Sequence, residues 1–150
     1  MILLYGKSDE PKTFSRELLK QALLVGYGVT NAELLHGECG EPLLTTEGLY
    51  VSISHCKSAA AVVVASAPCG VDIETDRPFH SDIAARFCTE RELTWLSLFD
   101  GDAYRLELLK LWTKKESVFK QTGVAMKDIE VFKSPVATLH RGEFILSYIH

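Results

Sequence analysis

Two acidic residues, Asp72 and Glu74, stand two positions apart in the segment GVDIE. In a β-strand, residues i and i+2 point to the same face, so the two carboxylates would lie side by side. Adjacent carboxylates repel each other unless a cation lies between them, and Mg²⁺ is commonly bound by one or two carboxylates together with substrate phosphates. The spacing therefore indicates a magnesium site, with a solvated strand end as the structural alternative.

A second charged group lies in the segment WTKKESVFK, between positions 112 and 120. Glu116 and Lys120 are four positions apart, so in a helix they share one face, and Lys115 directly precedes Glu116. The alternative is a surface ion pair, which stabilises a helix by only about 0.3 kcal/mol. These charges raise the question of which negative group the lysines face, and the GVDIE carboxylates are the candidates.

The pair Ser54–His55 closes an apolar, strand-like segment. It is suited to holding a phosphate or to capping a turn, and a hydrogen-bonded structural histidine is the alternative. No third residue obviously completes a Ser-His-Asp triad, so Ser54 is not expected to act as a nucleophile.

Composition limits the class of protein. The 150 residues suggest one domain spanning 1–150, and the formal net charge of −4 argues against a nucleic-acid partner. No apolar stretch approaches the roughly 18 residues that a membrane span needs. The four cysteines form no CxxC pair and are typical of reduced thiols, so a cytoplasmic protein without a membrane partner is expected.

The expected elements alternate irregularly between strands and helices, which favours an α+β fold over a βαβ fold. GLYVSISH, AAAVVVASA and VDIE read as an antiparallel meander, and Thr89 with Glu92 forms a capping box for a short helix. Asp102 is expected to cap the long helix, and Gly123 to end it. The other expected elements are a strand at 2–5, a helix at 13–28, helical pieces within 80–100, a strand at 129–133, and a hairpin at 136–150 that turns at Arg-Gly.

Read in order, five segments resemble the signature blocks of 4′-phosphopantetheinyl transferases of the Sfp type. They are GEP (40–42), SISHC (52–56), GVDIE (70–74), RFCTERE (86–92) and WTKKESVFK (112–120). That family moves the phosphopantetheine arm of coenzyme A onto a serine of an acyl or peptidyl carrier protein. The resemblance implies a Mg²⁺-dependent transferase of the holo-[acyl-carrier-protein] synthase kind, with coenzyme A as cosubstrate.

The resemblance also assigns roles to individual residues. Asp72, Glu74 and Glu116 correspond to the Mg²⁺ ligands, and Glu116 is also the general-base candidate for the serine hydroxyl. Lys120 corresponds to the lysine that contacts the coenzyme A phosphates and assists departure of the leaving phosphate. Metal and lysines would stabilise the charge that gathers during phosphoryl transfer, which answers the question raised by the helix charges.

Further positions correspond to coenzyme A contacts in the family. Lys115 matches a lysine near the pyrophosphate, and Ser54 with His55 matches the pair that holds the nucleotide phosphates. Arg16 resembles a basic residue near the nucleotide. By resemblance, the candidate carrier-docking surface comprises Arg86, Phe87, Arg91 and the start of the long helix. In the alternative, Phe87 is a core residue and the arginines are solvated charges.

The implied architecture is a pseudo-twofold fold with antiparallel strands packed on long helices, divided into halves 1–69 and 70–150. Both halves look abbreviated, and Glu41 stands where the family commonly has a lysine, which removes an expected cation and places an anion there. A non-catalytic relative that binds coenzyme A or a carrier protein is therefore one alternative, and a Mg²⁺-dependent nuclease is another. A homo-oligomer also remains open, because related small enzymes assemble active sites between chains.

Overall fold

The computed structural model describes residues 1–75 and 83–150. The helices and strands follow one another as β1 (Ile2–Lys7), α1 (Pro11–Tyr27), β2 (Leu34–His36), β3 (Pro42–Leu44), β4 (Tyr50–His55), β5 (Ala59–Ala65), β6 (Gly70–Thr75), α2 (Ala84–Phe87), α3 (Glu90–Leu96), α4 (Gly101–Thr122), the 3₁₀ turns η2 (Met126–Asp128) and η3 (Val131–Lys133), β7 (Ala137–Arg141) and β8 (Phe144–Ile149).

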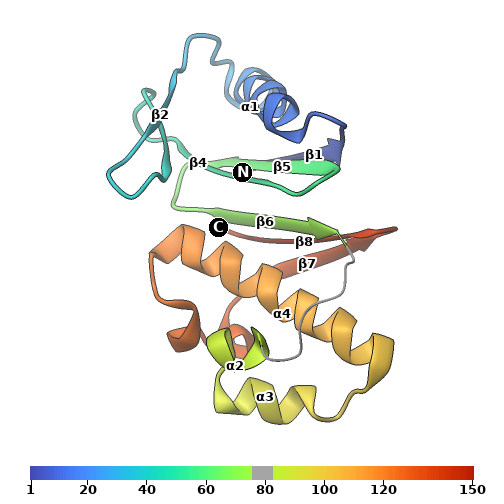
Figure 1. Cartoon of the computed structure of the whole chain (residues 1–150). Coiled ribbons are helices and arrows are strands. Elements are labelled where there is room, and N and C mark those ends of the chain that lie inside the picture. The colour runs from blue at the N-terminus through green and yellow to red at the C-terminus, as the bar shows by residue number, and fades with distance from the viewer. Residues whose placement is uncertain (76–82) are drawn as a thin grey trace.

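The chain forms two similar halves stacked on each other (Figure 1). In the first half, α1 covers an antiparallel sheet of order β1-β5-β4, and in the second half α4 covers an antiparallel sheet of order β6-β8-β7. The two sheets face each other between the helices. This arrangement confirms the predicted α+β fold built of antiparallel strands and long helices.

The central strand β5 explains why the two sheets pack so closely. Its seven residues are all alanine or valine, and all are buried, as the unbroken apolar run predicts. Alternate residues face opposite ways: Ala60, Val62 and Val64 pack with α1, while Ala61 and Val63 pack with the second sheet. Small side chains on the inner face let the second sheet approach.

The edge strands β4 and β6 meet at the boundary between the halves, and serine side chains join them. Ser52 Oγ accepts a hydrogen bond from the Val71 amide at 3.0 Å, and Ser54 Oγ accepts one from the Ile73 amide at 3.3 Å. The hydroxyls thus satisfy amides at the edge of β6 that would otherwise be buried without a partner.

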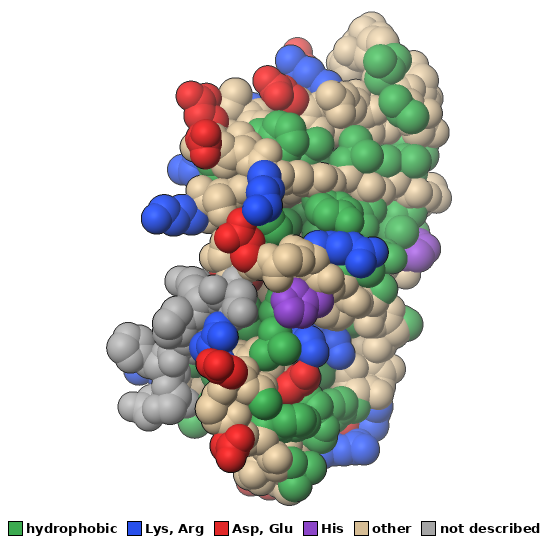
Figure 2. Space-filling model, turned by 90° about the vertical axis from the view of Figure 1, so that its right-hand side faces the viewer, with side chains coloured by type: hydrophobic (Ala, Val, Ile, Leu, Met, Phe, Trp, Pro, Cys, Tyr) green, Lys and Arg blue, Asp and Glu red, His purple; other side chains and the backbone are tan. Residues whose placement is uncertain are grey.

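On a neighbouring side of the molecule, Lys, Arg and His side chains gather at the level where the halves meet (Figure 2). Lys7 of β1 forms an ion pair with Glu143, which lies beside β8.

Three strand predictions need correction. VDIE does not extend a meander, because β6 pairs with β8 of the second sheet. The predicted strand 129–133 is instead the turn η3 with the two residues before it. Ile129 and Val131 are both buried in the core beneath α4, so the alternating apolar pattern reflects burial and not a strand. The hairpin turns at Gly142-Glu143, one residue later than predicted, with Gly142 at a φ of 60°.

The predicted helix ends are mostly confirmed. Thr89 and Glu92 form the capping box of α3, and Gly123 ends α4 in the left-handed conformation. Asp102 lies in the first turn of α4 rather than at its cap, which is Asp100, so that prediction was wrong by two residues. No helix within residues 1–75 and 83–150 is long and apolar enough to cross a membrane.

Gly70 begins β6 because α4 passes directly over its Cα. A Cβ built there would lie 1.8 Å from the carbonyl oxygen of Ser117, which is backbone and cannot move aside alone. The glycine of GVDIE therefore permits the close contact between β6 and α4.

We expect Gly70→Ala to lower the free energy of unfolding by about 2–3 kcal/mol, since the added methyl must push α4 away from β6. Urea unfolding would measure the loss. Gly37→Ala is the matched control, because its methyl would meet only the exposed carboxylate of Glu41. Equal stability of the two variants would contradict this explanation of Gly70.

Candidate functional site

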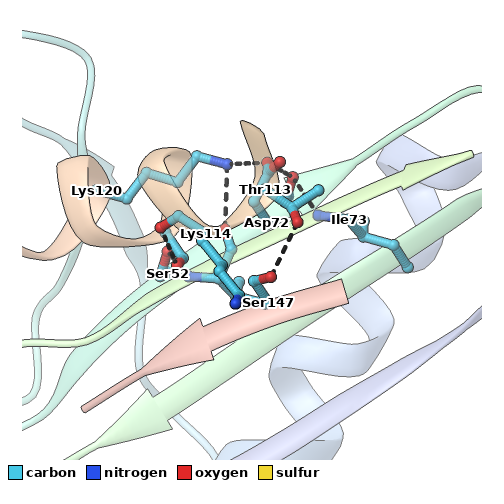
Figure 3. Close-up of polar contacts among 10 residues, drawn as sticks. Ser52, Asp72, Ile73, Thr113, Lys114, Lys120 and Ser147 are labelled. Carbon is cyan, nitrogen blue, oxygen red and sulfur yellow. Dashed lines mark hydrogen bonds and ion pairs between the residues drawn. The ribbon is translucent and has the colours of Figure 1, made fainter. Parts of the chain in front are cut away.

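Asp72 lies at the point where β4, β6 and α4 converge (Figure 3). The residue is 5% exposed, and its Oδ1 accepts hydrogen bonds from Ser54 Oγ at 2.8 Å and from Lys120 Nζ at 2.7 Å. Lys120 also donates to the Val71 carbonyl at 3.1 Å. One carboxylate oxygen therefore links both halves of the protein to the long helix.

The second oxygen of Asp72, Oδ2, is buried and has no hydrogen-bond partner among the residues that the structure describes. Buried polar atoms are nearly always paired, and an unpaired one costs folding free energy. An open carboxylate oxygen of this kind is an available ligand for a cation.

Glu116 is the second acid of the site. It lies one helical turn before Lys120, on the face of α4 that packs against β6, which also carries the buried Thr113. Burial raises the pKa of Glu116, the nearby negative charge of Asp72 raises it further, and Lys120 opposes the shift. Two carboxylates and one ammonium thus interact within one small region.

Glu74 follows on β6, two residues after Asp72, so the two side chains leave the same face of this strand. The structure nevertheless does not assemble a finished metal site: among residues 1–75 and 83–150, no three acidic, histidine or cysteine side chains are grouped closely enough to hold an ion. Instead, the ammonium of Lys120 occupies the first oxygen of Asp72.

Lys115 lies elsewhere. The side chain is completely buried, and its Nζ forms an ion pair with Glu92 Oε2 at 2.7 Å. Lys115 was expected to lie near a pyrophosphate, but its buried side chain cannot reach a bound ligand from this position. The reason is helical periodicity, because Lys115 falls on the core face of α4 with Leu108, Leu111 and Val118.

A basic cleft of about 480 Å³ lies next to Asp72, between α1, the β2–β3 hairpin and the end of β4. Its lining brings together the predicted residues Arg16, Ser54, His55 and Lys120. Lys12 and His36 also line it and were missed by the sequence analysis. Lys12 could have been found, since it precedes Arg16 by one helical turn, whereas nothing in the sequence marks His36.

Glu41 does not place its charge in this cleft. Its carboxylate accepts a hydrogen bond from the Cys39 amide at 3.0 Å and lines a neighbouring hollow of about 670 Å³. That second hollow is mainly apolar and shares Gly40, Pro42, Ile53 and Lys120 with the basic cleft. The expectation of an anion near the phosphate contacts is therefore corrected for position 41.

The candidate docking residues Phe87 and Arg91 differ in their exposure to solvent. Phe87 is buried and packs edge-on against Trp112, with ring centroids 5.1 Å apart, so it is a core residue. Arg91 is on the surface, where it lies over the Phe132 ring and pairs with Glu130 at 3.7 Å.

Comparison with known proteins identifies the family. Residues 68–150, which contain Asp72, Glu116 and Lys120, match the 4′-phosphopantetheinyl transferase superfamily. The chain belongs to this superfamily. It is also 32% identical over 123 residues to a 4′-phosphopantetheinyl transferase of Bacillus subtilis and 28% identical to 4′-phosphopantetheinyl transferase Sfp of Bacillus subtilis strain 168. Each alignment covers 79% of this chain, which spans about half, 55%, of the length of these relatives.

The raised pKa of Glu116 makes a stability prediction for the metal-free protein. The folded state binds this proton more readily than the unfolded state, so ionised Glu116 opposes folding as the pH rises. We expect Glu116→Gln to unfold at a higher temperature than the parent at pH 7 in EDTA. The advantage should disappear below about pH 4, where the glutamate is protonated in both states.

Glu130→Gln serves as the contrasting variant, because a hydrogen bond from Lys133 lowers the pKa of Glu130. Its effect at pH 7 and low salt should have the opposite sign and should also vanish in acid. Thermal unfolding across pH measures both variants. A Glu116→Gln variant less stable than the parent at pH 7 would refute the prediction.

Proposed function

We propose that the chain transfers the 4′-phosphopantetheine group of coenzyme A to a serine of an acyl or peptidyl carrier protein, with Mg²⁺ as cofactor. The observation that carries this proposal is the buried carboxylate of Asp72, whose Oδ1 bonds Lys120, a residue that lines the basic cleft, and whose Oδ2 has no partner among the described residues. Family membership supplies the transferase chemistry.

The donor chemistry of the residues present suits a magnesium ion, although the described carboxylates are not grouped closely enough to form a preformed site. Asp72, Glu74 and Glu116 would hold it, and the unpartnered Oδ2 of Asp72 is an oxygen ligand of the type that Mg²⁺ prefers. When bound, the ion would neutralise charge on the phosphates of the donor.

The basic cleft fits the phosphates of coenzyme A. Among its described lining residues are Lys12, Arg16, His36, His55 and Lys120, and none of that lining is acidic. The lysine and arginine side chains of α1 and α4 converge on the cleft and create a positive potential suited to a polyanion. This lining supports coenzyme A as the donor.

In the proposed reaction, the carrier serine hydroxyl attacks the phosphorus that bears the pantetheine arm, and the pyrophosphate P–O bond breaks. Ionised Glu116 accepts the hydroxyl proton, which its raised pKa favours. Lys120 stabilises the leaving phosphate of adenosine 3′,5′-bisphosphate. Ser54 holds Asp72 and the end of β4 in place.

We infer further that residues 1–150 act as one domain in the cytoplasm, where coenzyme A and carrier proteins are available, and require no nucleic acid or membrane. A non-catalytic relative that binds coenzyme A or a carrier is the second candidate, favoured because no three acidic, histidine or cysteine side chains of the described residues are grouped closely enough to hold an ion.

Intact-mass spectrometry tests the proposal. Apo carrier proteins of acyl and peptidyl type are incubated with the chain, coenzyme A and Mg²⁺, with EDTA as the control. A mass gain of one phosphopantetheine group that EDTA abolishes is the expected result. Tight coenzyme A binding by calorimetry without modification of any carrier would favour the binding relative instead.

Asp72→Asn should reduce kcat at least about hundredfold, because it removes the charge that holds Lys120 and the open ligand oxygen while keeping the size of the side chain. Steady-state transfer to an apo carrier measures it. Asp128→Asn, an exposed acid beyond the end of α4, is the control and should retain parental rates. Full activity of Asp72→Asn at saturating Mg²⁺ would exclude the proposed site.

A further inference from the structure

Glu92 and Lys115 form a fully buried ion pair behind the candidate site. Both side chains are 0% exposed. The Lys115 ammonium donates to three acceptors: Glu92 Oε2 at 2.7 Å, the Met126 carbonyl at 2.8 Å and the Ile129 carbonyl at 2.8 Å. An ammonium has three protons, so each one has a partner.

Glu92 is equally engaged. Its carboxylate accepts hydrogen bonds from the Thr89 amide at 2.8 Å and the Val131 amide at 3.3 Å, in addition to the ion pair. The pair therefore ties together the start of α3, the middle of α4 and the segment 126–131. These three parts of the chain are held by directional bonds rather than by apolar contact alone.

Stability alone does not account for a charged pair in this position. Replacing a buried ion pair by apolar residues of similar volume is often neutral or stabilising, because the charges lose their hydration. What distinguishes the pair from a leucine and a methionine is geometry, since its hydrogen bonds are satisfied in only one orientation of α4.

The orientation of α4 determines the candidate site. Lys115 and Glu116 are adjacent, so they project about 100° apart around the helix axis, one into the core and the other toward β6. On the β6 side, Thr113 Oγ1 lies 2.9 Å from Ser147 Oγ, and Ser147 pairs with Asp72 in the sheet. A rotation of about 20° would move a side chain on this helix surface by about 2 Å.

We propose that Glu92 and Lys115 are positioning residues, which set the rotation of α4 about its axis and thereby the placement of Glu116 and Lys120 against Asp72. This inference rests on the proposed transferase function. Neither residue touches the reacting groups, and each acts through the helix that carries them.

The test is the double variant Glu92→Leu/Lys115→Met, which removes both charges and leaves no buried unpaired ion. We expect the variant to unfold within about 5 °C of the parent. Its kcat should fall at least about tenfold with the KM for coenzyme A changed less than about twofold, because misplacing reacting groups by about 1 Å is costly. A folded variant with parental kcat would overturn the proposal.

The matched control is Glu107→Leu/Lys110→Met. This pair also lies on α4, at 2.7 Å, but both partners belong to the same helix and so cannot fix its rotation. Parental kcat is expected for the control. A loss of kcat equal to that of the buried pair would show a general effect of removing charge and overturn the proposal.

A geometric measurement decides the matter independently of activity. In a crystal structure of the double variant, we expect the 2.7 Å contact between Lys120 Nζ and Asp72 Oδ1 to be lost, and its retention would overturn the proposal. If the double variant does not fold, Glu92→Gln is judged by the same criteria. A parent chain that modifies no carrier refutes the proposed function, and the crystal comparison still decides this inference.

Discussion

The hydrogen bond from Ser54 to Asp72 is the interaction on which fold and site both depend. The two sheets meet at strands that share no main-chain bonds, so hydroxyls of β4 satisfy the amides of β6. Ser54 performs this task and simultaneously holds the Asp72 carboxylate. The junction between the halves and the candidate active site are therefore the same structure, and neither can change without the other.

This junction leaves one bonding position open in the buried carboxylate. Ser54 and Lys120 both donate to Oδ1, while Oδ2 has no partner. A protein selected for stability alone would bury a fully satisfied group or an apolar one at this place. The Asp72 carboxylate has one oxygen without a hydrogen bond, and the neighbouring Glu116 has a raised pKa. Both features are typical of groups that bind a ligand.

The sequence predicts most of this architecture and part of the site. Motif order indicated the family, and period-two alternation placed Asp72 and Glu74 on one face of a strand. The same reasoning misread 129–133, whose alternating apolar residues serve a 3₁₀ turn. Lys115 shows the limit of motif matching. Helical periodicity could have placed Lys115 on the core face of α4, but the sequence does not reveal its ion-pair partner, because Glu92 lies on another helix.

The basic cleft differs from the carboxylate site in how its charge is supplied. Its lysine and arginine side chains come from α1 and α4 and its imidazoles from β2 and β4, so no single residue determines the sign of the potential. The glutamate at position 41, where the family commonly has a lysine, accepts a hydrogen bond within its own hairpin and does not line the cleft. In the proposed metal site the carboxylate allows no such sharing, because a ligand oxygen must lie at one place. The constraint on Asp72 is therefore stricter than that on any cation around it.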